Sequence, residues 1–308
     1  MTNPGREDLT EREWPPAVLA ATGTPVTATR LAGAGGPGSF RVEGPRGSIA
    51  YKRSVPPREL AFYQRCAPHT AQLAAAGCRT AALVASGPEP EPWLALGWAG
   101  RPLPREQWGT ASVLAALAAW HRAATLWEGP LDDGYPFAWD DALTRAALDA
   151  LTASERDAVR DDWGRAAEAA RCELFAPPGH AIHGDPNPTN WLVGVDDPES
   201  SLVLLDWARP GRAHPAVDVA IALPGLPTDE RASQAAQQYL RARQDLRKPD
   251  GAAWTRGILL AKLWSAVEFL AMATRGDLSQ DAESGVAFLR ADLPGWSRRH
   301  RVAGRDRS

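Results

Sequence analysis

Residues 181–211 read AIHGDPNPTNWLVGVDDPESSLVLLDWARPG, and this stretch decides the fold. Two short apolar runs, 192–195 and 202–205, flank an Asp-Asp-Pro sequence that favours a turn. We therefore predict a β-hairpin centred between Pro198 and Glu199, in which position 192 faces position 205. The loop before the first strand and the end of the second strand then converge.

The predicted hairpin gathers polar side chains at one point. In this register Asn190 lies diagonally close to Asp206, while Asp185 stands at the near end of the same loop. A carboxylate and an amide oxygen are hard ligands of the kind that Mg²⁺ uses, with phosphate and water in its other positions. Asp185 is placed to accept a proton from an attacking hydroxyl. Phosphoryl transfer needs little else beyond in-line positioning and charge neutralisation.

This segment resembles the catalytic and metal-binding segments of the aminoglycoside phosphotransferase and choline kinase-like family. The resemblance covers the His-Gly-Asp-x4-Asn loop of residues 183–190, the Asp-Trp pair at 206–207, and the Asp-Val-Ala at 218–220, where the family usually has Asp-Leu-Ala. Protein kinases carry Arg in place of Gly184 and Phe-Gly after the metal-binding aspartate. The small-molecule branch is therefore the better fit.

The resemblance implies a protein-kinase-like α+β fold with a small β-rich lobe and a larger helical lobe. It also implies Asp185 as the catalytic base, Asn190 and Asp206 as Mg²⁺ ligands, and Asp218 as a structural acceptor that braces the loop. The alternative is an ordinary hairpin surrounded by turn residues, with His183 as a structural hydrogen-bonding residue. Four motifs in order and at the correct spacing favour the functional interpretation.

A second signal lies upstream, in residues 48–53 (SIAYKR), which alternate as a strand does. Alternation puts Ala50 and Lys52 on one face, where the small residue leaves room for adenine and the lysine holds the nucleotide phosphates. Pro56-Pro57 opens a helix that we expect to end near residue 67, and Glu59 in its first turn would orient Lys52. The alternatives are an exposed lysine at a strand end and a glutamate favoured by the helix dipole.

Two further segments are candidates for nucleotide binding. Gly35 and Gly36, within a glycine-rich stretch before the lysine strand, would cover the phosphates with backbone N–H groups. Residues 94–103 look like a connector between lobes, where adenine would meet the backbone around Leu96 and Trp98. The family often has an acidic residue here and this chain has none, so GTP stays possible beside ATP. No Walker P-loop pattern is present.

The order of these patterns predicts two lobes. Residues 1–98 form the nucleotide-binding lobe and residues 99–308 the catalytic and acceptor-binding lobe, with the connector at about 96–103. Other strand candidates are 26–31, 80–85 and 93–98, and helical patterns cover 106–128, 139–174, 228–245 and 252–274. His121 and the thirteen tryptophans read as packing residues and are assigned no chemistry.

Composition limits the remaining classes. The net charge of −3 recruits neither nucleic acid nor an anionic membrane, and three scattered cysteines are too few for a zinc site. The most apolar stretch, 258–273, is interrupted by Lys262 and Glu268 and reads as a buried helix. We expect a cytoplasmic protein, monomeric or homodimeric, whose partner is a small-molecule hydroxyl acceptor.

One acidic segment bears on the identity of the acceptor. Six acidic residues against one basic residue between positions 128 and 149 would attract a cationic compound, such as an aminoglycoside. They are Glu128, Asp132, Asp133, Asp140, Asp141 and Asp149. The alternative is that Asp140 caps a helix and the others form a solvated face. Two other functions remain open: a kinase of a metabolic substrate such as an amino alcohol or ketoamine, and an inactive nucleotide-binding regulator.

Overall fold

The computed structural model describes residues 14–31, 38–88, 91–128, 134–194, 202–246, 249–278 and 282–300. The chain divides into two compact units. Unit 1 consists of Met1–Leu103, Thr125–Gly129 and Thr189–Arg209, and unit 2 of Pro104–Ala124, Pro130–Pro188 and Pro210–Ser308. Unit 1 holds a large sheet and unit 2 is mainly helical, so the α+β class predicted from the sequence is confirmed.

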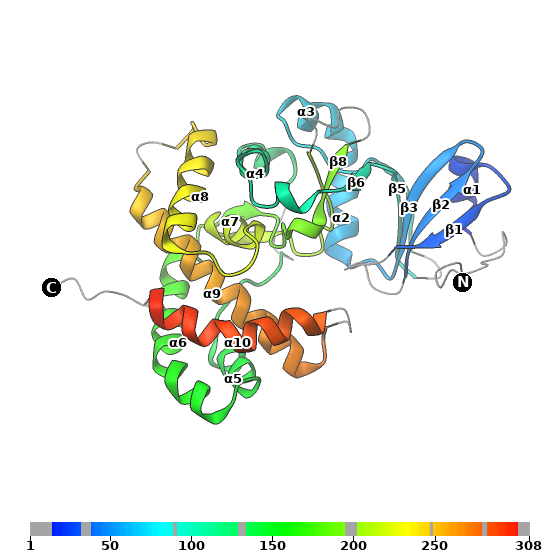
Figure 1. The fold of residues 1–308 in the computed structure, drawn as a ribbon. Helices are drawn as coiled ribbons and strands as arrows, with labels where there is room; N and C mark the ends of the chain where they lie inside the picture. The colour runs from blue at the N-terminus through cyan, green and yellow to red at the C-terminus, as the bar shows by residue number, and fades with distance from the viewer. Residues whose placement is uncertain are drawn as a thin grey trace. The chain divides into compact units, whose positions relative to one another are not determined.

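Unit 1 is built on a five-stranded antiparallel sheet in the order β1-β2-β3-β5-β4 (Figure 1). Its strands are β1 (Thr27–Arg30), β2 (Ser39–Gly44), β3 (Gly47–Arg53), β4 (Leu83–Gly87) and β5 (Trp93–Gly97). The helices of the unit are α1 (Pro16–Thr22), α2 (Pro57–Cys66) and α3 (Thr70–Ala75). A second sheet, in the order β6-β8-β9, is formed by β6 (Gly100–Pro102), β8 (Trp191–Gly194) and β9 (Leu202–Leu204).

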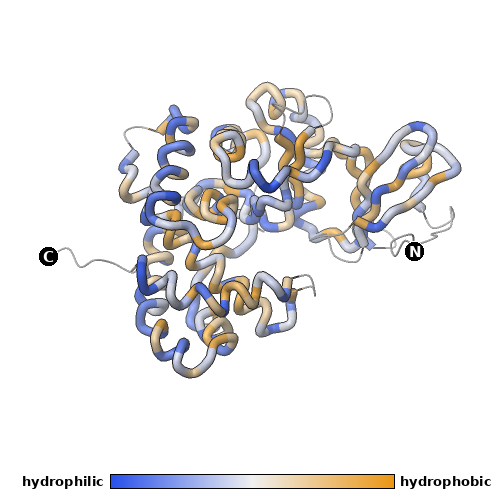
Figure 2. Tube along the Cα trace, in the orientation of Figure 1, coloured by the Kyte–Doolittle hydropathy of each residue, from blue (hydrophilic) through white to orange (hydrophobic). Residues whose placement is uncertain are grey.

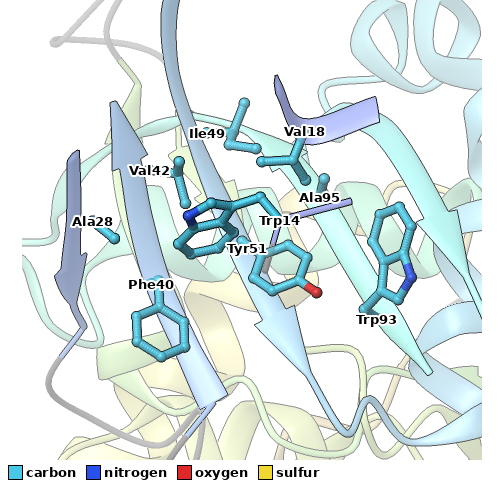
Figure 3. Close-up of a cluster of buried hydrophobic side chains, with 9 residues drawn as sticks. All are labelled: Trp14, Val18, Ala28, Phe40, Val42, Ile49, Tyr51, Trp93 and Ala95. Atoms are coloured by element: carbon cyan, nitrogen blue, oxygen red, sulfur yellow. The ribbon is translucent and has the colours of Figure 1, made fainter. Parts of the chain in front are cut away.

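One face of the five-stranded sheet packs against the segment that carries α1. The buried cluster on this face contains Trp14, Val18, Ala28, Phe40, Val42, Ile49, Tyr51, Trp93 and Ala95 (Figure 3). The ring of Trp14 meets that of Tyr51 edge-on, with the centroids 5.2 Å apart. Because side chains alternate along a strand, burial of Ile49 and Tyr51 directs Ala50 and Lys52 to the opposite face. The alternation predicted for this strand is therefore confirmed.

The sequence analysis missed α1, β2, α3 and β6 in unit 1. Helix α1 has only seven residues and no side-chain hydrogen bond at its N-cap, so little in its sequence marks its start. Strand β2 directly follows the glycine-rich stretch, which masked its alternation. The predicted helix from residue 56 to about 67 is confirmed as α2, after which a 3-10 turn, Ala67–His69, leads into α3.

Unit 2 is organised around one long helix. Its helices are α4 (Ala111–Arg122), α5 (Asp141–Asp149), α6 (Ala153–Glu173), α7 (Ala216–Ala222), α8 (Asp229–Ala242), α9 (Gly251–Arg275) and α10 (Glu283–His300). Helix α9 packs against α5, α7 and α8, and β7 (His180–Ile182) pairs with β10 (Gly211–Ala213). Figure 2 shows α8 as mostly hydrophilic, because only the face that carries Ala232, Ala235, Ala236 and Tyr239 is buried.

Helix α9 contains the apolar stretch predicted to be buried. By length and composition alone α9 could cross a membrane, but 67% of its most apolar 18-residue segment is buried inside the protein. Lys262 and Glu268, which interrupt the stretch, are themselves buried. The hydroxyl of Tyr135 donates to Glu268 Oε1 at 2.8 Å, which satisfies part of that carboxylate. The burial of α9 therefore agrees with a core helix.

Lys262 should make the stability of the protein rise with pH. Its ammonium donates to the carbonyl of Leu223 at 2.7 Å, and burial lowers its pKa from 10.5 to about 7. Above pH 7 the unfolded chain holds this proton and the folded chain does not, so the free energy of unfolding increases until about pH 10.5. The slope approaches about 1.4 kcal/mol per pH unit. Chemical denaturation at several pH values should show this rise, and Lys262→Met should flatten it; parallel curves would contradict the assignment.

Candidate active site

The hairpin of β8 and β9 differs from the predicted one by two residues in register. Trp191 pairs with Leu204, and Leu192 pairs with Val203, whereas position 192 was expected to face 205. The observed register sets Trp191 against Leu204, both fully buried, and burial of opposed side chains outweighs the turn preference used in the prediction. A shift of two residues keeps each side chain on its predicted face. The turn itself lies outside the described residues.

The convergence predicted at the open end of the hairpin is nonetheless present. The amide of Leu205 donates to the carbonyl of Asn190 at 2.9 Å, which puts Asp206 next to the partner of Asn190. The backbone of Asp206 is left-handed, with φ of +59°. Asp tolerates this conformation better than most residues, and such strain is common at functional sites. This backbone conformation turns the chain, so the side chains of Asp206 and Trp207 contact different parts of unit 1.

Asp206 contacts the lysine predicted from the upstream strand. Its Oδ1 lies 3.1 Å from Lys52 Nζ, and Lys52 Nζ also donates to Glu59 Oε2 at 2.7 Å. Burial alone would lower the pKa of Lys52, but the carboxylates of Asp206 and Glu59 outweigh it and raise that pKa. Burial raises the pKa of Glu59 to about 7, against the opposing effect of Lys52. Strand β3, helix α2 and the residue after the hairpin, 154 positions from Lys52, thus form one ion network.

The side chain after Asp206 fixes helix α2 in place. The indole of Trp207 is fully buried and stacks on Phe62, with centroids 3.7 Å apart and an interplanar angle of 7°. Its Nε1 donates to the carbonyl of Leu204 at 3.3 Å. Phe62 follows Glu59 by three residues, so both face the same side of α2. The stacking therefore helps to hold the Glu59 carboxylate beside Lys52.

The remaining predicted nucleotide residues lie on β3, β5 and the segment after them. Ala50 pairs with Leu96, and both lie on the face of the sheet away from the buried cluster that contains Tyr51 and Ala95. The amide of Trp98 donates to the carbonyl of Ser48 at 3.4 Å, and the Arg41 guanidinium lies 4.4 Å from the centroid of the Trp98 ring. Gly35 and Gly36 lie outside the described residues.

The loop that carries Asp185 belongs to unit 2 and is held by its main chain. The fully buried carboxylate of Asp218 accepts from the amides of His183 and Gly184, each at 2.8 Å. The amide of Asp185 donates to His183 Nδ1 at 3.1 Å. Gly184 has φ of +86°, a conformation that glycine adopts without strain. The bracing role predicted for Asp218 is confirmed, and Asp185 itself is half-buried.

Sequence reasoning missed how Asp218 is itself held. His121 Nε2 lies 3.0 Å from Asp218 Oδ2, and His121 Nδ1 lies 2.7 Å from the hydroxyl of Tyr239. His121 was assigned no chemistry because a histidine on an apolar helix face is usually a packing residue. No local pattern could have revealed these contacts, since the partners are 97 and 118 residues away.

Two of the acidic residues between positions 128 and 149 have local structural partners. Asp140 is the N-cap of α5, where Oδ1 accepts from the amide of Leu143 at 2.7 Å. Asp149 forms an exposed ion pair with Arg156 at 3.7 Å. Asp132 and Asp133 lie outside the described residues. The capping role considered for Asp140 is therefore confirmed.

Comparison with known proteins identifies the class. The model of the phosphotransferase enzyme family matches residues 30–256, more than half of the chain, so the chain belongs to that family. A search of curated proteins found no match. The family resemblance inferred from the motifs in residues 183–220 is thus confirmed.

Three solved structures share the fold at low sequence identity. A microcompartment-associated aminopropanol kinase has a TM-score of 0.68 at 15% identity, covering 92% of this chain and 95% of that one. A spectinomycin phosphotransferase complex with ADP has a TM-score of 0.60 at 12% identity, covering 93% and 95%. A GDP complex of an aminoglycoside 2′-phosphotransferase has 0.58 at 15% identity, covering 90% and 92%. The fold is the protein-kinase-like fold, and family and fold together support a small-molecule phosphotransferase.

Proposed function

We propose that the protein transfers the γ-phosphoryl group of ATP to a hydroxyl of a small molecule, with Mg²⁺ as cofactor. The observation that carries the proposal is the ion network of Lys52, Glu59 and Asp206. A lysine that contacts two carboxylates, on the same strand face as a small residue, is the arrangement that phosphoryl transfer uses to hold a nucleotide. Membership of a phosphotransferase family agrees with this use.

In unit 1 the proposed nucleotide residues have separate tasks. Lys52 binds the phosphates, and Glu59 keeps the ammonium aimed at them. Ala50 leaves space for the base, and the backbone at Leu96 and Trp98 meets the edge of that base. The stretch with Gly35 and Gly36 covers the phosphates. GDP and an ATP analogue occur in structures of similar fold, which supports nucleotide use and leaves GTP as an alternative donor.

Asn190 and Asp206 are the proposed metal ligands. They supply an amide oxygen and a carboxylate from the same end of one hairpin, and oxygen donors of this kind suit Mg²⁺. Asn190 is 6% exposed, and the carboxylate of Asp206 is restrained by its contact with Lys52 at 3.1 Å. When bound, Mg²⁺ would neutralise charge on the phosphates. Asp206 also contacts Lys52, so the lysine ammonium has both Asp206 and Glu59 as partners.

Asp185 is the proposed catalytic base. Its carboxylate would accept the proton of the attacking hydroxyl as the oxygen becomes a nucleophile. The hydrogen bonds from His183 and Gly184 to Asp218 hold the preceding backbone, so Asp185 starts from a fixed position. Asp185 precedes Asn190 by five residues in the chain, which links the base and the metal ligand covalently through one short segment.

The wider assignments belong to the same proposal. Residues 1–98 would form the nucleotide lobe and 99–308 the catalytic and acceptor lobe, joined by a connector at about 96–103. The protein would act in the cytoplasm as a monomer or homodimer, with neither nucleic acid nor a membrane as partner. The burial of α9 within unit 2 agrees with this environment.

The acceptor is proposed to carry a protonated amine beside the hydroxyl. Aminoglycosides and amino alcohols share this chemistry, and both classes occur among the names of structures with this fold. We expect such compounds to stimulate ADP release more strongly than neutral polyols of matched size, and more at low than at high salt. A coupled ADP assay with paired acceptors measures this. Preference for neutral or anionic acceptors would contradict the cationic class, and no stimulation by any acceptor would favour the inactive regulator.

A further inference from the structure

A continuous row of polar side chains runs from the C-terminal end of α8 to the loop before Asp185. Arg243 donates through Nε and Nη2 to the two carboxylate oxygens of Asp245, each at 2.8 Å. Its Nη1 donates to the hydroxyl of Tyr239 at 2.8 Å. That hydroxyl lies 2.7 Å from Nδ1 of His121, whose Nε2 lies 3.0 Å from Asp218 Oδ2.

The interior of this row is sealed from water while one end is exposed. The side chains of His121 and Asp218 are 1% and 0% exposed, and that of Arg243 is 4% exposed. Asp245, at 43%, is open to solvent. Buried polar networks of this kind are costly when partly satisfied, so each member depends on its neighbours. All of these residues, with the loop they reach, belong to unit 2.

The direction of each hydrogen bond follows from chemistry. Arginine has only donors, so the Tyr239 oxygen accepts from Arg243, and beside a neutral His121 ring its own proton points to Nδ1 of His121. Burial raises the pKa of Tyr239, which keeps that proton on the phenol. His121 Nδ1 therefore accepts, and Nε2 carries the hydrogen that is donated to Asp218. The opposite tautomer would set a lone pair against the carboxylate.

We propose that His121, Tyr239 and Arg243 are positioning residues: they form a directed relay that fixes the Asp218 carboxylate and, through the amides of His183 and Gly184, the placement of Asp185. Asp218 Oδ2 accepts from both His121 and the His183 amide, so loss of the His121 hydrogen bond changes the oxygen that holds the loop. The relay makes the catalytic step sensitive to the exposed ion pair of Arg243 with Asp245. Its effect on turnover rests on the proposed function, whereas its effect on the loop does not.

Tyr239→Phe tests the relay with little change in volume. We expect kcat to fall about threefold to tenfold while the KM for nucleotide stays unchanged, because only the placement of Asp185 is altered. Ser297→Ala is the matched control: it removes a buried hydrogen bond of the same unit, the one that Trp163 Nε1 donates to Ser297 at 3.2 Å. That control should lower the Tm without lowering kcat. If both variants change only the Tm, the relay is refuted.

A double-mutant cycle tests whether the effect of Asp245 on kcat depends on the hydroxyl of Tyr239. Asp245→Ala removes the exposed end and should lower kcat by a factor of about two to five in the parent. In the Tyr239→Phe background the same change should have no further effect. Independent, multiplying effects would show that the two residues act separately and would overturn the proposal.

Hydrogen exchange separates this proposal from the proposed function. The amides of His183 and Gly184 should exchange faster in Tyr239→Phe than in the parent, and at the parent rate in Ser297→Ala. This measurement needs neither nucleotide nor acceptor. Faster exchange in a protein without phosphotransferase activity would keep the relay and refute the function. Unchanged exchange would refute the relay whatever the activity.

Discussion

Asp185→Asn is expected to retain nucleotide binding and to lower kcat by about 10²–10⁴-fold, the usual cost of removing a general base. Asparagine keeps the size and shape of the side chain, and the main-chain amide of Asp185, which donates to His183 Nδ1, is unchanged by the substitution. The loop should therefore keep its conformation. What is lost is the ability to accept the proton of the acceptor hydroxyl.

Steady-state turnover and nucleotide titration, measured on the same preparation, separate the two effects. Asp162→Asn is a suitable control because it removes one carboxylate from unit 2 at an exposed ion pair with Arg165. It should keep both turnover and binding. An Asp185→Asn variant that turns over within threefold of the parent would remove Asp185 from the role of base.

The convergence of Asn190 and Asp206 at one end of a hairpin could be predicted because the two residues flank a short hairpin in the sequence. The backbone hydrogen bond between Leu205 and Asn190 shows this convergence, while the roles of the side chains stay predictions. The alternation of residues 48–53 likewise fixed the face of Lys52. Local order of this kind is what a single sequence states most clearly.

The register of the hairpin and the support of Asp218 could not be predicted in the same way. Register followed from the burial of Trp191 against Leu204, which depends on the surrounding core rather than on the turn. The contacts of His121 join residues about a hundred positions apart with no periodic pattern. Tertiary packing determines which distant residues come into contact, and a single sequence does not show that packing.

The ion network of unit 1 combines both cases. Lys52 and Glu59 are seven residues apart and were paired from the sequence, while the contact of Lys52 with Asp206 spans 154 residues. Stacking of Trp207 on Phe62 connects these two contacts, because it fixes the helix that carries Glu59 to the residue after Asp206. The tryptophan assigned only to packing thus supports a candidate functional group.

Asp206→Ala should abolish the dependence of nucleotide affinity on Mg²⁺, with a loss of about 10²-fold or more at saturating metal. The carboxylate is the one proposed metal ligand with a negative charge, and its removal also leaves Lys52 with Glu59 as its remaining partner in the network. Affinity in the absence of Mg²⁺ should therefore fall little or even increase. This difference separates loss of the metal from general damage to the site.

Asn190→Ala is the matched comparison, since it removes an amide oxygen and no charge. Its nucleotide affinity should fall by about tenfold and should still rise with Mg²⁺, because the Asp206 carboxylate remains to bind the metal. Calorimetric titration of nucleotide at graded Mg²⁺ concentrations, with thermal unfolding to verify folding, distinguishes the two variants. Both variants binding nucleotide as the parent does, with the same response to Mg²⁺, would show that the hairpin end does not hold the metal.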